Sequence, residues 1–199
     1  RKKYSVLKAR EVLMKLPVSS NTESSFKNLN SFNEFSFIFK TNIPATLREL
    51  FPLNTYKIKG SIGQGRVTQC PWIAIMHANE TQSTQEGVYI VFLFSEDLKK
   101  IYITLAQGVT KSTQDSIVAK RDQIRNTLSF DSELLKEYNE LKIRNPQYNN
   151  SAIYSNEWPI NDNIKCLDIV YKFKEAYEEY MEDKYHFIRI LPKRPFSSV

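Results

Sequence analysis

Four short segments in the middle of the chain carry apolar residues in patterns typical of β-strands. These segments are Tyr56–Gly60, Trp72–Met76, Val88–Phe94 and Ile101–Leu105. They alternate along the chain or are rich in β-branched and aromatic residues. Only a short polar segment separates the last two, so we expect them to pair as an antiparallel hairpin. Four strands so close together predict a sheet at the centre of the fold.

Helical patterns lie on both sides of these strands. Apolar residues recur at helical spacing, Pro44 lies near a predicted first turn, and Ser112 and Thr113 are typical N-cap residues. One face of the helix predicted after them carries the apolar residues Ile117, Ile124 and Leu128. The predicted helical segments are Tyr4–Met14, Thr41–Phe51, the segment after Ser112–Asp115, Asp131–Leu141 and Ile164–Met181, and Ala152–Tyr154 is a brief extended candidate.

The chain is long enough to bury one substantial core. It has 199 residues, of which 41% are hydrophobic. We expect a single α+β domain over residues 1–199, with a curved, largely antiparallel β-sheet flanked by helices. Its core is residues 40–130, its helical C-terminal part residues 131–185, and residues 186–199 form a tail.

No apolar run approaches the ~20 residues that a membrane-spanning helix needs. The longest is Val88–Phe94, and no basic-then-apolar leader opens the chain. We therefore expect no membrane partner and a cytoplasmic location.

All five glycines lie between Gly60 and Gly108, and three of them fall within Gly60–Gly65. Glycine permits positive φ and close approach of the main chain to another group. The cluster therefore predicts a specialised loop between two strands, and this loop is where a binding function is expected.

Positive charge is concentrated in the part of the chain that carries the glycines. Residues 1–130 hold 18 Lys and Arg against 10 Asp and Glu, whereas residues 131–199 hold 10 against 12. An excess of this sign fits a polyanion such as DNA, because neutralised phosphates release condensed counterions. Ordinary solubility charge is the alternative explanation.

The sequence offers no familiar catalytic or metal-binding arrangement. Gly60–Gly65 lacks the Lys-Ser/Thr pair and following helix of a P-loop, and His77 and His186 are the only histidines. Cys70 and Cys166 are the only cysteines, too few for a zinc cluster or a disulfide framework. We expect no catalytic residue, no metal and no cofactor.

Two other function classes stay open. A small magnesium-dependent DNA nuclease could use Glu96 and Asp97 with Lys99, or Glu140 with Lys142, although such carboxylates are usually solvated surface charge. A protein-interaction domain could instead dock a partner on a sheet face.

Period two divides Val88–Phe94 between two faces of the sheet. Tyr89, Val91 and Leu93 share one face, and Trp72 of the neighbouring segment could complete its wall. A cavity lined by Trp and Tyr suits a planar ligand with polar edges, because stacking supplies affinity and hydrogen bonds supply choice. Alternatively, helices could pack both faces closed.

A set of motifs in fixed order runs through the predicted sheet. They are Lys59-Gly-Ser-Ile-Gly-Gln-Gly65, Pro71-Trp-Ile-Ala-Ile75, Gly87-Val-Tyr-Ile-Val-Phe-Leu-Phe-Ser-Glu-Asp97 and Leu105-Ala-Gln-Gly-Val-Thr110. Together, over about residues 40–130, they resemble the N-terminal DNA-binding domain of McrB-type modification-dependent restriction proteins, the MrcB-like N-terminal domain family. This combination is far more specific than any one motif.

The resemblance implies a reader of a modified base in double-stranded DNA, such as 5-methylcytosine, within an antiphage restriction system. In that family the base is flipped out of the duplex into a pocket, and the domain itself does not cleave DNA. An AAA+ GTPase and a nuclease subunit are the implied partners. By position, Trp72, Tyr89 and Leu93 would line the base pocket.

The resemblance also assigns the glycine loop to the DNA. Gly63, Gln64 and Gly65 would form the tip that enters the duplex, with Gln64 standing where the best-known member has an aromatic wedge. Glutamine would fill the gap with hydrogen bonds to the orphaned partner base or to base edges. The proposed contacts to the DNA backbone are Lys59, Ser61, Arg66, Lys99 and Lys111.

Overall fold

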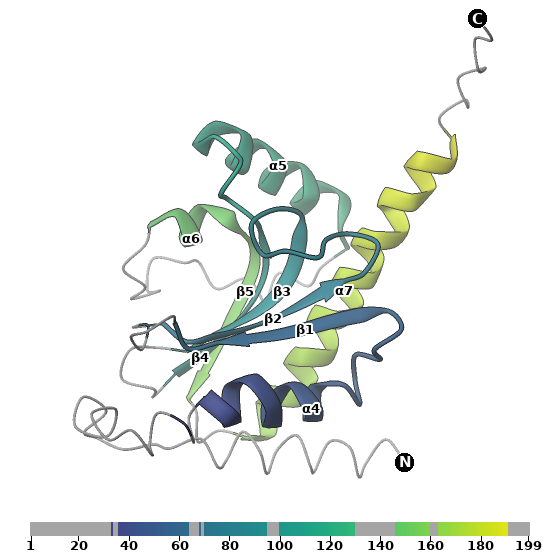
Figure 1. Cartoon of the computed structure of the whole chain (residues 1–199). Helices are drawn as coiled ribbons and strands as arrows, with labels where there is room; N and C mark the ends of the chain where they lie inside the picture. Colours follow the sequence, from purple (N-terminus) through teal and green to yellow (C-terminus); the bar gives the residue numbers. More distant parts are fainter. Residues whose placement is uncertain are drawn as a thin grey trace, which may run out of the picture.

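A five-stranded antiparallel sheet forms the centre of the protein in a computed structural model (Figure 1). The structure describes residue 33 and residues 36–63, 68, 70–94, 100–129, 146–159 and 163–190. The strands lie in sequence order and are β1 Tyr56–Ser61, β2 Trp72–His77, β3 Val88–Phe94, β4 Lys100–Gln107 and β5 Ala152–Pro159. The predicted α+β class, with a largely antiparallel sheet flanked by helices, is confirmed, and the sheet is open.

The pairing of the strands follows their alternation. The predicted β3–β4 hairpin is confirmed, with Val88 opposite Gln107 and Phe94 opposite Ile101. The brief extended candidate at residues 152–154 is longer than predicted, because β5 pairs with β4 along its whole length. The register of that pairing shifts between Leu105 and Ala106, which is typical of a β-bulge.

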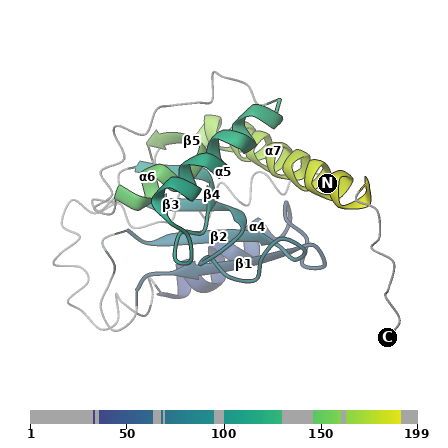
Figure 2. The ribbon, with the colours of Figure 1, turned by 90° about the horizontal axis from the view of Figure 1, so that it is seen from above.

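Helices cover the sheet on both sides. In Figure 1, α4 lies below the sheet, and α5 and α6 lie above it. Figure 2 shows α7 running beside α5. The bounds are η1, a π-helix, Ile38–Asn42, α4 Ile43–Leu47, α5 Gln114–Thr127, α6 Pro146–Ser151 and α7 Asn163–Ile190.

The first described helical segment begins earlier than the sequence predicted. The chain is already helical at Ile38, and Asn42 before α4 has helical dihedral angles and makes no side-chain cap. Because the preceding helical turn supplies acceptors for the first N–H groups of α4, no side-chain cap is needed there. Pro44 does occupy the first turn of α4, as predicted.

The predicted N-cap of α5 is confirmed. The Thr113 side chain accepts a hydrogen bond from the N–H of Ser116 at 3.3 Å. At the other end of the chain, α7 does not stop near Tyr185 but continues to Ile190, so residues 186–190 belong to a helix and not to a tail. No proline or glycine interrupts this stretch before Pro192. The predicted helices at Tyr4–Met14 and Asp131–Leu141 lie outside the described residues.

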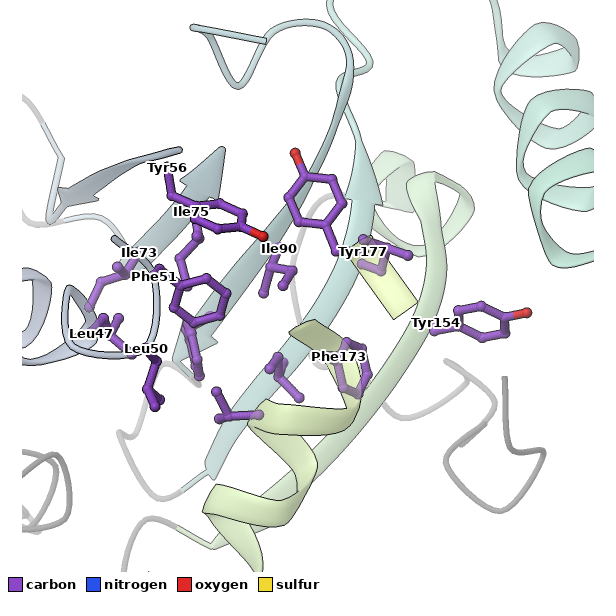
Figure 3. Close-up of a cluster of buried hydrophobic side chains, with 14 of the residues drawn as sticks. Leu47, Leu50, Phe51, Tyr56, Ile73, Ile75, Ile90, Tyr154, Phe173 and Tyr177 are labelled. Carbon is purple, nitrogen blue, oxygen red and sulfur yellow. The ribbon is translucent and has the colours of Figure 1, made fainter. Parts of the chain in front are cut away.

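One face of the sheet carries the main hydrophobic core (Figure 3). Ile73 and Ile75 of β2 lie near Leu47 of α4, and Ile90 of β3 lies beside Phe173 and Tyr177 of α7. The opposite face carries a smaller cluster of buried residues, Ala74, Met76, Tyr89, Val91, Leu93, Tyr102 and Ala106. Every residue of β3 is buried, and period two divides β3 between the two clusters as predicted. No helix among the described residues has both the length and the apolar character to cross a membrane.

Gly60 allows η1 to pack directly on β1. A Cβ atom at Gly60 would lie 1.9 Å from the carbonyl oxygen of Phe39, far inside contact distance. Because that oxygen belongs to the backbone, it cannot move aside by a change of rotamer. The first glycine of the cluster thus serves packing of the fold.

Replacement of this glycine should destabilise the domain. We expect Gly60→Ala to lower the free energy of unfolding by about 2 kcal/mol or more, because the η1 backbone must shift. Urea denaturation followed by circular dichroism measures the change. Leu53→Ala, at a residue 65% exposed in the turn before β1, is the control and should change stability by less than about 0.5 kcal/mol. Equal stability of Gly60→Ala and the wild type would contradict the close packing of η1 on β1.

Candidate nucleic-acid interface

The sheet face opposite the main core is hollowed. Directly opposed residues on antiparallel strands share a face, and the register places Trp72 opposite Leu93, and Tyr89 opposite Ala106. These side chains line a recess of about 140 Å³. Its full lining is Trp72, Thr84, Gln85, Tyr89, Val91, Leu93, Thr104, Ala106, Gln107, Val109, Thr110 and Ser151.

The structure brings together the three residues predicted to form a base pocket. Trp72 is partly exposed at the end of β2, whereas Tyr89 and Leu93 are 6% and 4% exposed on β3. The Tyr89 hydroxyl donates a hydrogen bond to the carbonyl oxygen of Thr84 at 3.0 Å. That bond holds the phenol ring at one orientation in the wall of the recess.

Small side chains on the neighbouring strand leave room for the recess. Ala106 is opposite Tyr89, and Thr104 is opposite Val91. A short side chain beside a large one leaves a step in the surface of a sheet, and interior packing elsewhere leaves few such voids. The recess therefore follows from the order of side chains along β3 and β4.

The lining of the recess also contains polar side chains to which the sequence analysis assigned no role. Thr104, Gln107 and Ser151 are buried in its lining, and the Gln107 amide nitrogen donates to the carbonyl oxygen of Ile117 at 2.6 Å. Gln107 and Thr110 belong to the motif Leu105–Thr110, which could have indicated them. Ser151 reaches the recess only because β5 pairs with β4, which no local pattern predicts.

Exposed lysines of β1 share the face of the recess. Lys59 is opposite Ala74 and Ser61 is opposite Trp72, so both predicted DNA-backbone residues lie on the correct side of the sheet. Lys57, opposite Met76, is a third residue of this row that the sequence analysis did not name. Lys57 lies two residues before Lys59, and residues two apart on a strand share a face, so the sequence could have indicated it. Lys57 and Lys59 are both exposed.

Another predicted cation lies on a second side of the recess. Lys111 follows Thr110 of the lining, and its ammonium group forms an ion pair with Glu86 at 3.0 Å. Both side chains are more than half exposed, so this pair contributes only about 0–1 kcal/mol. Lys111 can exchange Glu86 for another anion at little cost.

Part of the predicted glycine loop is described. Gly63 has φ of 102°, the positive value for which glycine was expected, and its N–H donates to the Ser61 hydroxyl at 3.3 Å. Gln64, Gly65 and Arg66 lie outside the described residues, as does Lys99. The carboxylates of the nuclease alternative, Glu96, Asp97 and Glu140 with Lys142, also lie outside them.

Cys70 and His77 are two titratable side chains near the sheet among the described residues. Burial raises the pKa of the Cys70 thiol to about 11, so this thiol stays protonated at neutral pH. Burial also lowers the pKa of His77, and its Nδ1 accepts the N–H of Asn79 at 3.2 Å. Within the described residues, no three His, Cys, Asp or Glu side chains gather closely enough to hold a metal ion.

A larger hollow of about 710 Å³ lies between the ends of β1 and β2 and helix α7. Its lining includes Glu178 and Glu182 together with His77. Carboxylates repel phosphates, so this hollow is unsuited to DNA despite its size. The smaller recess, with lysines beside it, is the better candidate for a polyanion.

The fold and the recess define a class of protein: an α+β domain whose open antiparallel sheet has one packed face and one hollowed face bordered by cations. Residues 18–182 match the family described as MrcB-like, N-terminal domain, and the chain belongs to this family. Membership fits a DNA-binding module of a restriction system and suggests association with a larger protein of that system. None of the curated proteins compared with the chain matches it.

The same substitution at two alanines tests whether the recess is an unfilled cavity. Ala106 lines the recess, whereas Ala74 is fully buried without lining it. We expect Ala106→Ile to leave the free energy of unfolding unchanged or to raise it by about 1 kcal/mol, because new methyl groups fill a void. Ala74→Ile should lower it by about 1–3 kcal/mol through overpacking. Urea denaturation measures both, and equal losses in the two variants would contradict an open recess.

Proposed function

We propose that the chain is a DNA-binding specificity module that accepts one modified base, flipped out of duplex DNA, in the recess walled by Trp72, Tyr89 and Leu93. The observation that carries this proposal is a small aromatic recess beside a row of exposed lysines, in a member of the MrcB-like family. The module itself is non-catalytic. GTP hydrolysis and cleavage belong to an associated AAA+ GTPase and a nuclease subunit of an antiphage restriction system in the cytoplasm.

The size of the recess supports a single base as the ligand. Pockets for drug-sized ligands occupy about 300–1,000 Å³, whereas this recess measures about 140 Å³. A planar group of one ring suits that volume, and sugar and phosphate then stay at the surface. A base inside an intact duplex could not reach the recess, so the base must be flipped.

The walls support discrimination of a methyl group. Leu93 and Val91 offer apolar contact, and Trp72 offers a face for stacking. Each buried carbon of the modification contributes a modest ~1 kcal/mol, and stacking of a base on an aromatic ring contributes about 1–3 kcal/mol. A methylated base such as 5-methylcytosine therefore gains over its plain counterpart.

The residues around the recess support contacts to the edge of the base and to the phosphates. Thr104, Gln107 and Ser151 place polar side chains where the edge of a base would lie. Lys59 and Lys111 flank the recess and can bind the phosphates on either side of the flipped nucleotide. Gly63, Gln64 and Gly65 are proposed to occupy the gap left in the duplex.

Removal of the indole tests the pocket. Trp72→Ala should lower the affinity ratio of modified to plain duplex from about fivefold for one buried methyl carbon to near one, because the base is no longer held against the apolar wall. Fluorescence anisotropy at physiological salt measures it with duplexes carrying 5-methylcytosine, hydroxymethylcytosine, N4-methylcytosine or N6-methyladenine. Ala106→Ile, which fills the recess, should lose the same discrimination.

The control for this experiment is Phe37→Ala, which removes an aromatic ring that is 57% exposed just before η1. This variant should keep the wild-type ratio. If the wild type binds every modified duplex and the plain duplex equally, the chain is not a reader of modified bases.

Removal of one lysine tests the phosphate contacts. Lys59→Ala should weaken binding to modified and plain duplexes alike and reduce the slope of log affinity against log salt by about one. The same anisotropy assay over a series of salt concentrations measures both effects. Lys172→Ala is the matched control, because this exposed lysine lies on α7, which packs on the opposite face of the sheet. Equal salt slopes for the two variants would remove Lys59 from the interface.

A further inference from the structure

Glu80 is a buried carboxylate in the loop that joins β2 to β3, residues 78–87. Its side chain is 1% exposed, and it forms an ion pair with Lys184 of α7. One carboxylate oxygen also accepts hydrogen bonds from the N–H of Val88 at 2.9 Å and the hydroxyl of Tyr180 at 3.0 Å. A buried charge is costly unless it is paired, and here one helix and one strand pair it. Glu80 therefore ties the β2–β3 loop to α7.

Tyr177 ties the two ends of the same loop to α7. Its hydroxyl accepts a hydrogen bond from the N–H of His77 at 2.9 Å and donates to the carbonyl oxygen of Val88 at 2.6 Å. Figure 3 shows this side chain lying against the strands beside Ile90. Burial raises the pKa of both the Tyr177 and the Tyr180 hydroxyls, so each keeps its proton and remains a donor.

The other side of this loop forms a border of the recess. Thr84 and Gln85 line it, and the carbonyl oxygen of Thr84 accepts the hydroxyl of Tyr89. The carbonyl oxygen of Gln85 accepts a hydrogen bond from the N–H of Thr110, another lining residue, at 3.3 Å. The β2–β3 loop therefore lies between α7 and the recess and contacts both.

We propose that Glu80 is a positioning residue for base selection, through which α7 holds Thr84 and Gln85 against the recess. The inference rests on the proposed function, since it concerns the selectivity of the same recess. When α7 releases Glu80, the loop withdraws, the Tyr89 hydroxyl loses its acceptor, and the recess fits the modified base less closely. Lys59 lies on β1 and not in this loop, so the general affinity for DNA that it supplies is retained. Lys111, whose ammonium group pairs with Glu86 of the loop, is exposed and can still reach a phosphate.

Variants at both ends of the ion pair test the proposal. Glu80→Gln keeps an oxygen acceptor but loses the charge, and Lys184→Met removes the cation. Each should reduce the affinity ratio of modified to plain duplex by about fivefold, with little change in binding to the plain duplex. Lys184→Arg restores the pair and should restore the ratio. Asp183→Asn, an exposed neighbour on α7, is the matched control and should keep the wild-type ratio.

Hydrogen exchange measured by NMR without DNA gives an independent readout. In Lys184→Met, the amides of Val88 and Thr110 should exchange about tenfold faster, because the bonds that hold the loop are weakened. The amide of Ile90, at the centre of β3, should keep its wild-type rate. Thermal melts followed by circular dichroism establish that each variant is folded before binding is measured.

The two experiments separate failure of this inference from failure of the proposed function. If the wild type discriminates and Lys184→Met discriminates equally well, Glu80 does not position the recess, whether or not the loop exchanges faster. Unchanged exchange of Val88 and Thr110 would likewise overturn the tie between α7 and the loop. If the wild type does not discriminate among the four modified duplexes and the plain one, the proposed function fails and the role in selection fails with it.

Discussion

The period-two alternation of β3 is the constraint on which the rest of the structure depends. This central strand is buried along its whole length, so each of its side chains must be packed on one face or the other. Ile90 and Phe92 join the main core with α4 and α7, while Tyr89 and Leu93 face the other way. A shift of register by one residue would exchange the two sets. The strand that stabilises the fold thus also fixes the wall of the recess.

The two faces differ because different elements cover them. Long apolar side chains from η1, α4 and α7 fill the space over one face. The smaller cluster on the other face contains Ala74 and Ala106, and residues from loops and from the end of α6 surround it. Ala106 lines the recess, whereas Ala74 is fully buried beside it, so the open space lies over the β3 and β4 end of this cluster. A fold with one closed face can retain an open site on the other without loss of its main core.

Much of the fold could be predicted because it is local. The strands at Trp72 and Val88 and the cap at Thr113 each follow from a few neighbouring residues, and the structure has them where expected. The length of β5 could not be predicted, since it depends on pairing with β4 across many residues and on a shift of register at Leu105. The end of α7 could not be predicted, because Pro192 and Pro195 indicate that a helix stops before them but not how far before, and α7 continues to Ile190.

Part of the candidate site could likewise be predicted from the sequence, and part could not. Alternation together with the order of motifs places Trp72, Tyr89 and Leu93 in one wall, and the register Trp72 opposite Leu93 brings two of them side by side. Ser151 could not be predicted, because only tertiary pairing brings it to the recess. Glu80 could not be predicted either, since a lone glutamate in a polar loop is usually solvated and its burial depends on tertiary contacts with Val88, Tyr180 and Lys184.

Under the proposed function, affinity and selectivity belong to different elements of the fold. Contacts to phosphate position a protein on DNA without reading it, and contacts to a base carry the specificity. In this chain the candidate phosphate contacts, Lys59 and Lys111, lie on β1 and on the loop after β4, while the recess is floored by β3 and bordered by a loop tied to α7. Lys59 is separate from that loop, whereas Lys111 contacts it through Glu86. Under the proposed function, a change in α7 would therefore alter which base is accepted more than it alters the contact made by Lys59. A module that must test many sites before it commits to one benefits from that separation.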